Sequence, residues 1–160
     1  MKSIIEAGDL KGKRALVRVD WNISQGDTFR IEVSMPTIQY LLDAGAIITL
    51  ATHGENIREL KEFVPTGVEL LSNLRENPGE EANSEEFAME LAKNQDIYVN
   101  EAFSASHREH TSIVGVPKLL PSYAGLRFMD EVKELSKAFN PPHPFLFLLG
   151  GAKFETKVKL

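Results

Sequence analysis

The sequence predicts an α/β domain of three layers, in which helices cover both faces of a mainly parallel, Rossmann-like sheet of about four or five strands. Short apolar runs alternate along the chain with helix-like segments, which is the pattern of βαβ units. Polar side chains also follow directly after several of these runs. Because ligands bind beyond the carboxyl ends of parallel strands, this second observation predicts a shared basic pocket at that edge.

Four apolar, β-branched runs predict the strands, at 13–19, 46–52, 67–73 and 96–102. Between the first two runs, Pro36 can occupy the first turn of a helix that places apolar residues on one face and closes at Gly45. A short helix is expected at 57–63. These connections have the length that parallel strands require.

Two further helices are expected in the second half of the chain. Ser84 is a typical N-cap for a helix that runs to Lys93, with Phe87, Ala88 and Leu91 facing inward. Residues 122–140 suggest a helix packed through Phe128, Val132 and Leu135. The acidic run of Glu80, Glu81, Glu85 and Glu86 is interpreted as a solvated helix start, favoured by the helix dipole.

Composition limits the classes of function. The 160 residues suit one domain, or one domain with part of another, and contain 42% apolar and 26% charged residues. A formal net charge of −5 argues against broad binding to nucleic acid. No apolar run is long enough to span a membrane, so a cytoplasmic location is the default expectation. The absence of cysteine excludes disulfides and thiolate metal sites.

The candidate site residues are those that follow the apolar runs, and most of them can bind an anion. They are Asp20, Asn22 and Arg30 after the first run, His53 after the second, Arg75 after the third, and His107, Arg108 and His110 after the fourth. Arginine suits phosphate because its planar fork offers two aligned donors and keeps its charge. A single arginine is more often a solvated surface residue, so an anion site requires several of these arginines to converge.

Two other patterns are weaker. His107 and His110 lie three residues apart, but no third metal ligand has an obvious spacing, so no metal is expected. A role in orienting Arg108 or in local hydrogen bonding is favoured instead. The run from Gly150 to Lys153 lacks the spacing of a P-loop, although its glycines would let a backbone approach phosphate closely.

Successive motifs from Lys13 onward resemble those of phosphoglycerate kinase. They are RALVRVDWNIS, RIEVSMPTIQYLLDAGA, NLRENPGEEANSEEFAMELA, DIYVNEAFSASHREHTSIVGVPKLLPSYAG and LLGGAKFETK, in the same order as in the family. The resemblance implies a substrate-binding α/β domain over 1–121, an interdomain helix and linker over 122–143, and the first strand and Gly-Lys loop of a nucleotide-binding domain over 144–160. It further implies that the chain ends shortly after that domain begins.

The resemblance also implies roles for the candidate residues. Asp20 and Asn22 match the polar pair that grips the hydroxyacid end of 3-phosphoglycerate, and Arg30 matches the arginine beside the carboxylate and the transferring phosphoryl group. His53 matches the histidine of the family's HLGRP loop, whereas Arg75 and Arg108 match arginines that hold the other phosphate. Lys153 and Lys157 match lysines near the nucleotide phosphates, with Lys157 and Arg30 as the catalytic pair. For Asp20, accepting a hydroxyl proton or orienting an arginine are both open.

The chain departs from the family pattern in three places. Where the family has HLGRP, the chain has His53-Gly54-Glu55-Asn56, so the arginine of that loop is absent, and Arg58 stands at a different position. The segment between this loop and the NLR motif is too short for the family's full complement of elements, which predicts the loss of one βα unit. The proline that follows the Asn-Val pair in the family is also absent.

The expected function is therefore that of the substrate domain of a phosphoglycerate kinase, which in the complete enzyme transfers a phosphoryl group between 1,3-bisphosphoglycerate and Mg-ADP, giving 3-phosphoglycerate and Mg-ATP in glycolysis. This chain alone is expected to be inactive and to need a C-terminal, nucleotide-binding half as partner. Two alternatives are a non-catalytic module that binds a phosphorylated metabolite and an interaction protein that donates its terminal apolar strand to another sheet.

Overall fold

The computed structural model describes residues 1–23, 28–54, 57–146 and 148. A single sheet contains five strands in the order β3-β2-β1-β4-β5, and every neighbouring pair is parallel. The strands are β1 (Arg14–Arg18), β2 (Ile47–Ala51), β3 (Glu69–Leu70), β4 (Ile97–Asn100) and β5 (Ser122–Ala124). The predicted parallel α/β fold is therefore confirmed.

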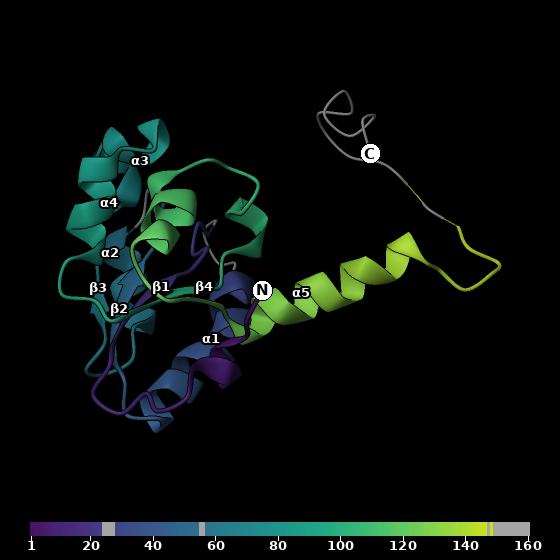
Figure 1. Cartoon of the computed structure of the whole chain (residues 1–160), viewed down its shortest axis with the longest axis horizontal. Coiled ribbons are helices and arrows are strands. Elements are labelled where there is room, and N and C mark those ends of the chain that lie inside the picture. The colour runs from purple at the N-terminus through teal and green to yellow at the C-terminus, as the bar shows by residue number, and fades with distance from the viewer. Residues whose placement is uncertain (24–27, 55–56, 147, 149–160) are drawn as a thin grey trace.

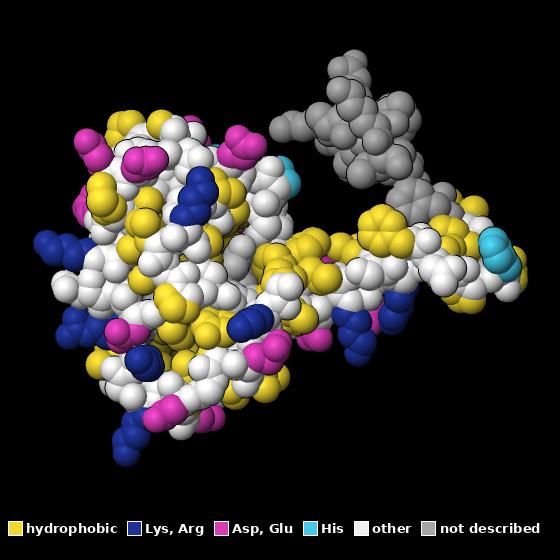
Figure 2. Space-filling view, viewed as in Figure 1, with side chains coloured by type: hydrophobic (Ala, Val, Ile, Leu, Met, Phe, Trp, Pro, Cys, Tyr) yellow, Lys and Arg dark blue, Asp and Glu magenta, His cyan; other side chains and the backbone are white. Residues whose placement is uncertain are grey.

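Helices lie on both faces of this sheet (Figure 1). The α-helices are α1 (Phe29–Asp43), α2 (Ile57–Leu60), α3 (Gly79–Ala82), α4 (Glu85–Ala92) and α5 (Leu126–Ser136). The 3-10 and π-helical turns are η1 (Ile4–Ala7), η2 (Lys61–Phe63), η3 (Leu74–Glu76), η4 (Phe103–Ala105), η5 (Thr111–Gly115), η6 (Val116–Lys118) and η7 (Lys137–Phe139). Helix α5 begins at the body of the domain and extends away from it (Figure 1 and Figure 2).

The alternation of side chains along β1 explains the three layers. Val17 is buried in a cluster that includes Ile38 and Leu41 of α1, whereas Leu16 is buried in a second cluster with Phe87 and Leu91 of α4. Successive residues of a strand point to opposite faces, so a central strand with the consecutive apolar residues Ala15, Leu16 and Val17 requires cover on both sides.

Helix α1 begins at Phe29 rather than at Pro36, so the expected start at the proline is wrong. Tertiary contacts hold the earlier turns: Ile31 is buried, and Ser34 accepts a hydrogen bond of 2.8 Å from Trp21 Nε1. These contacts outweigh the loss of one backbone donor at Pro36. As a result, Arg30 lies in the first turn of a helix and has a defined direction.

The expected helix over 122–140 is wrong at its beginning and in part of its packing stripe. Ser122–Ala124 forms the edge strand β5, and α5 starts only after Gly125. Phe128 is buried, but Leu135 is 52% exposed because this part of α5 lies beyond the domain body. By contrast, the expected capping of α4 is confirmed, since Ser84 Oγ accepts a hydrogen bond from the Phe87 backbone N–H.

Most of the segment 144–160 lies outside the described residues, including the Gly-Lys loop with Lys153 and Lys157. The domain boundaries at 121 and 143 therefore stay predictions. Among the residues that the structure describes, no helix has both the length and the apolar character that crossing a membrane demands.

Candidate functional site

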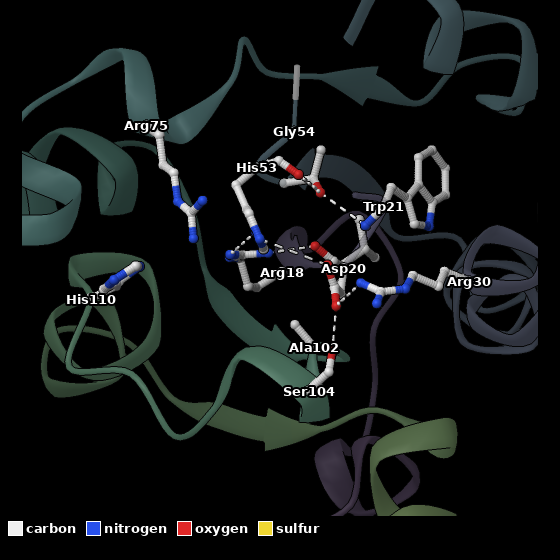
Figure 3. A network of polar contacts seen from close by, with 12 residues as sticks. Arg18, Asp20, Trp21, Arg30, His53, Gly54, Arg75, Ala102, Ser104 and His110 are labelled. Carbon is white, nitrogen blue, oxygen red and sulfur yellow. Dashed lines mark hydrogen bonds and ion pairs between the residues drawn. The ribbon is translucent and has the colours of Figure 1, made fainter. Parts of the chain in front are cut away.

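Asp20 is at the centre of a polar network beyond the carboxyl end of β1 (Figure 3). Its Oδ2 accepts a hydrogen bond of 2.6 Å from Arg30 Nη1 and a second one from the Ser104 hydroxyl. Its Oδ1 lies 3.9 Å from His53 Nε2. Side chains from α1, from η4 and from the loop after β2 thus meet at one carboxylate, as expected for the edge of a parallel sheet.

One oxygen of this carboxylate has no partner among the described residues. Asp20 Oδ1 is buried without a hydrogen bond, and the 3.9 Å to His53 Nε2 is too long for one. A buried acceptor without a donor is costly unless a ligand or water supplies the donor. The arrangement therefore leaves one carboxylate oxygen ready for a hydroxyl group while Arg30 fixes the other.

Arg18, which the sequence pattern did not indicate as a site residue, is buried beneath His53 with only 1% of its surface exposed. Its Nη2 donates to His53 Nδ1 over 2.8 Å, its Nε donates to Ser112 Oγ over 2.9 Å, and its Nη1 donates to the Val19 carbonyl. Burial is the main cause that lowers the pKa of Arg18 from its ordinary value. Three directed hydrogen bonds fix the guanidinium in one orientation.

Glu80 is fully buried, so its interpretation as part of a solvated helix start is wrong. Its carboxylate accepts hydrogen bonds from the Ser112 backbone N–H over 2.9 Å and from Ser112 Oγ over 2.5 Å, and its Oε1 lies 3.8 Å from His110 Nδ1. A buried arginine requires negative charge nearby, and Glu80 supplies it through Ser112. The other three glutamates of the run are exposed.

Arg75 approaches the same centre from the side opposite Arg30 (Figure 3). It belongs to η3, its side chain is 32% exposed, and its Nε lies 3.3 Å from Glu81 Oε1. Its positive charge is one of the causes that lower the pKa of His53, which places it within electrostatic reach of that ring. The two arginines therefore flank the Asp20 and His53 pair.

Arg108 lies near the same pair in the loop that follows η4, and it is half-buried. Its charge contributes to lowering the pKa of both His53 and His110. The structure thus brings Arg30, Arg75 and Arg108 around one centre, although they are far apart in sequence. Asn22 is also adjacent, since its Oδ1 is 3.3 Å from the place a Cβ on Gly54 would occupy.

Gly54 allows the loops after β1 and β2 to approach each other. Its φ of +153° is one that residues with a side chain rarely adopt, and a Cβ there would also come within 3.4 Å of Asn22 Cα. Asn73 supports this loop by accepting from the Gly54 N–H over 3.3 Å. Glu55 and Asn56 lie outside the described residues, and Arg58 is exposed on α2.

His53 is uncharged at neutral pH. Its pKa is lowered from the ordinary 6.5 to about 4, first by burial and then by the positive charge of Arg18, while the negative charge of Asp20 opposes the shift. Burial also lowers the pKa of His110, which Glu80 opposes. Within the described part of the chain, no group of three or more His, Asp or Glu side chains is placed to hold a metal ion.

The depressed pKa of His53 predicts a pH-dependent loss of stability. Between pH 6.5 and about pH 4 the unfolded chain binds a proton at this residue and the folded chain does not, so acid favours unfolding. We expect His53→Gln to remove about 1–2 kcal/mol of the stability lost between pH 7.5 and pH 4.5. Urea unfolding at both pH values measures this difference, and identical losses in the two proteins would contradict it.

The fold and the site are those of a parallel α/β domain that presents arginines and a carboxylate at the carboxyl ends of its strands, groups that suit the binding of a small anion. The family model of phosphoglycerate kinase matches residues 5–64 and 53–160. The chain belongs to the phosphoglycerate kinase family.

Individual relatives agree with this assignment. The chain is 37% identical over 199 aligned positions to the phosphoglycerate kinase of Caulobacter vibrioides and 37% identical over 192 positions to that of Dictyoglomus turgidum, covering 98% and 94% of this chain. It is similar to the solved phosphoglycerate kinase of Coxiella burnetii, with a TM-score of 0.82 and 28% identity over 98% of this chain and 50% of that one. It is also similar to the solved phosphoglycerate kinase of Pyrococcus horikoshii, with a TM-score of 0.84 and 26% identity over 99% of this chain and 51% of that one. The chain spans about half the length of the curated relatives, 50% and 48% respectively.

The alignments also reflect the short segment after His53. An alignment of 199 positions with a chain of 160 residues leaves at least 39 positions without a counterpart here. The family model matches 53–64 twice, once at the end of one match and once at the beginning of the other. Both observations agree with the expected loss of one βα unit between β2 and β3, which leaves β3 at the edge of the sheet.

Proposed function

We propose that this chain is the substrate half of a phosphoglycerate kinase and that it binds 3-phosphoglycerate or 1,3-bisphosphoglycerate at the carboxyl edge of its sheet. The observation that carries the proposal is the arrangement of Arg30, Arg75 and Arg108 around Asp20 and His53. Phosphoryl transfer depends mainly on positioning and neutralising charge, and this site consists of groups that do both.

The two ends of the site have different roles in this proposal. Asp20, with Asn22 beside it, receives the hydroxyacid end of the substrate, and the free Oδ1 of Asp20 accepts its hydroxyl proton. Arg30, held by Asp20 at 2.6 Å, neutralises the carboxylate side and the transferring phosphoryl group. Arg75 and Arg108 hold the phosphate that is not transferred.

The nucleotide belongs to a second half in this proposal. Mg-ADP or Mg-ATP would be held by a C-terminal domain like that of the relatives, with Lys153 and Lys157 of this chain near the nucleotide phosphates and Lys157 assisting transfer. Closure of the two domains would bring the substrates together and exclude water. Alone, the chain binds substrate without turnover, and glycolysis in the cytoplasm is the proposed setting.

Calorimetric titration with 3-phosphoglycerate tests the substrate site. Wild type is expected to bind weakly, and Arg30→Ala, Arg75→Ala and Arg108→Ala are each expected to lose about 1–3 kcal/mol of binding free energy, the scale of a lost charged hydrogen bond. Arg14→Ala is the matched control, because Arg14 is exposed at the opposite end of β1. Equal affinities of all five proteins would refute the proposed substrate site.

A coupled kinase assay tests the role as half of an enzyme. We expect no turnover by this chain alone and measurable turnover when a C-terminal half from a relative is added. Binding of 3-phosphoglycerate without turnover in either mixture would favour the non-catalytic metabolite-binding module instead. No binding and no turnover would leave only an interaction role.

A further inference from the structure

The hydrogen bonds beneath His53 have a fixed direction, because arginine can only donate. Arg18 Nη2 lies 2.8 Å from His53 Nδ1, so Nδ1 must be the acceptor and cannot carry a proton. A neutral imidazole has its single proton on the other nitrogen, which here is Nε2. The contact with Arg18 therefore determines which tautomer of His53 is present.

The same reasoning extends from Arg18 to Glu80. Arg18 Nε donates to Ser112 Oγ over 2.9 Å, so this hydroxyl must direct its own proton elsewhere, and Glu80 Oε1 is 2.5 Å away. Glu80 also accepts the Ser112 backbone N–H over 2.9 Å, which fixes the serine at both ends. All three side chains are at most 1% exposed, so water does not compete for these bonds.

We propose that Glu80, Ser112 and Arg18 act as positioning residues that hold His53 in one neutral tautomer, with its proton on Nε2 and directed into the Asp20 site. His53 then serves as a hydrogen-bond donor to the substrate, not as a cation that attracts it. This role in binding rests on the proposed function, whereas the tautomer itself does not.

The geometry at Nε2 agrees with a donor that awaits a ligand. Nε2 lies 3.9 Å from Asp20 Oδ1, which is too far for a hydrogen bond, and Oδ1 has no other partner among the described residues. An oxygen of the ligand beside both atoms can accept from His53, and a hydroxyl there can also donate to Asp20. The positive charges of Arg18, Arg75 and Arg108 favour the neutral form of the His53 ring. Only the negative charge of Asp20 favours its protonated form among these four groups.

Nitrogen-15 NMR of the ligand-free chain tests the tautomer directly. At pH 7 we expect His53 Nδ1 to show the shift of an unprotonated ring nitrogen and Nε2 that of a protonated one, in a single form. A protonated Nδ1, an imidazolium at pH 7, or a mixture of tautomers in wild type would overturn the proposal.

Two variants separate positioning from charge. Arg18→Lys keeps the positive charge but loses the fork that reaches both Ser112 and His53, and Ser112→Ala removes the link to Glu80. In each we expect a tautomer mixture at His53 and about 5- to 10-fold weaker binding of 3-phosphoglycerate, the scale of one neutral hydrogen bond. An unchanged single tautomer in either folded variant would show that the hydrogen-bond relay of Glu80, Ser112 and Arg18 does not determine the tautomer.

Thr111→Val is the matched control, since it removes a buried hydroxyl next to Ser112 whose hydrogen bonds go to the Gly79 and Ser84 carbonyls and not to the relay. It is expected to lose some stability and to leave the His53 signals unchanged. The NMR result does not depend on substrate binding. A single Nε2-protonated form in a chain that fails to bind 3-phosphoglycerate would therefore reject the proposed function and leave the relay intact.

Discussion

Arg18→Met is expected to lower the free energy of unfolding by about 3–5 kcal/mol, the cost of breaking a buried charged network from one side. The replacement leaves Glu80 as a fully buried carboxylate without the positive charge that faces it through Ser112. His53 Nδ1 also loses its donor. Urea unfolding followed by circular dichroism at pH 7.5 measures the loss.

Arg14→Met is the control for this experiment, because Arg14 begins the same strand but is exposed, and its loss is expected to stay within about 0.5 kcal/mol of zero. Adding Glu80→Leu to Arg18→Met is expected to recover part of the lost stability, since the unpaired charge is then removed. If Arg18→Met and Arg14→Met were equally stable, Arg18 would not be the centre of a buried network.

Gly125→Ala is expected to destabilise the domain by about 2–3 kcal/mol through overpacking. A Cβ at this position would lie 1.8 Å from Glu101 Oε2 and 2.6 Å from its Cδ. The carboxylate cannot easily move, because it accepts hydrogen bonds from Thr37 Oγ1 over 2.5 Å and from the first backbone N–H groups of α5, at 3.1 and 3.3 Å. Thermal and urea unfolding both report the loss.

A double-mutant cycle with Glu101→Ala identifies the cause. In the Glu101→Ala background the obstructing carboxylate is gone, so the added Gly125→Ala is expected to cost less than about 1 kcal/mol. Glu101→Ala itself is expected to loosen the start of α5, since two of its backbone donors lose their acceptor. Equal costs of Gly125→Ala in both backgrounds would show that contact with Glu101 is not the reason.

The sequence was sufficient to predict elements in which the local capping and periodicity signals agree with the tertiary packing. Helix α4 has its Ser84 cap and its apolar stripe in the same stretch, and it begins and packs as expected. Strand β5 was missed because three residues followed by a glycine carry little periodicity, and its identity depends on pairing with β4. The start of α1 was missed because contacts of Ile31 and Ser34 outweigh the local preference of Pro36.

The sequence indicated those polar residues that follow the ends of strands. It did not indicate the charged residues that are buried inside a strand or a helix. Asp20, His53 and the three arginines come after apolar runs; Arg30 and His53 lie beside Asp20, and Arg75 and Arg108 lie within electrostatic reach of His53. Arg18 had a signal that could have been used, since a charged residue inside an apolar central strand must be paired. Glu80 had none, because its burial depends on Ser112, which is 32 residues away in sequence.

A crystal structure of this chain with bound 3-phosphoglycerate would show whether Arg30, Arg75 and Arg108 hold one and the same ligand. We expect one ligand molecule at the carboxyl edge of the sheet, with its hydroxyacid end on Asp20 and Arg30 and its phosphate between Arg75 and Arg108. A ligand bound elsewhere on the domain, or one that leaves any of these three arginines out of reach, would contradict it.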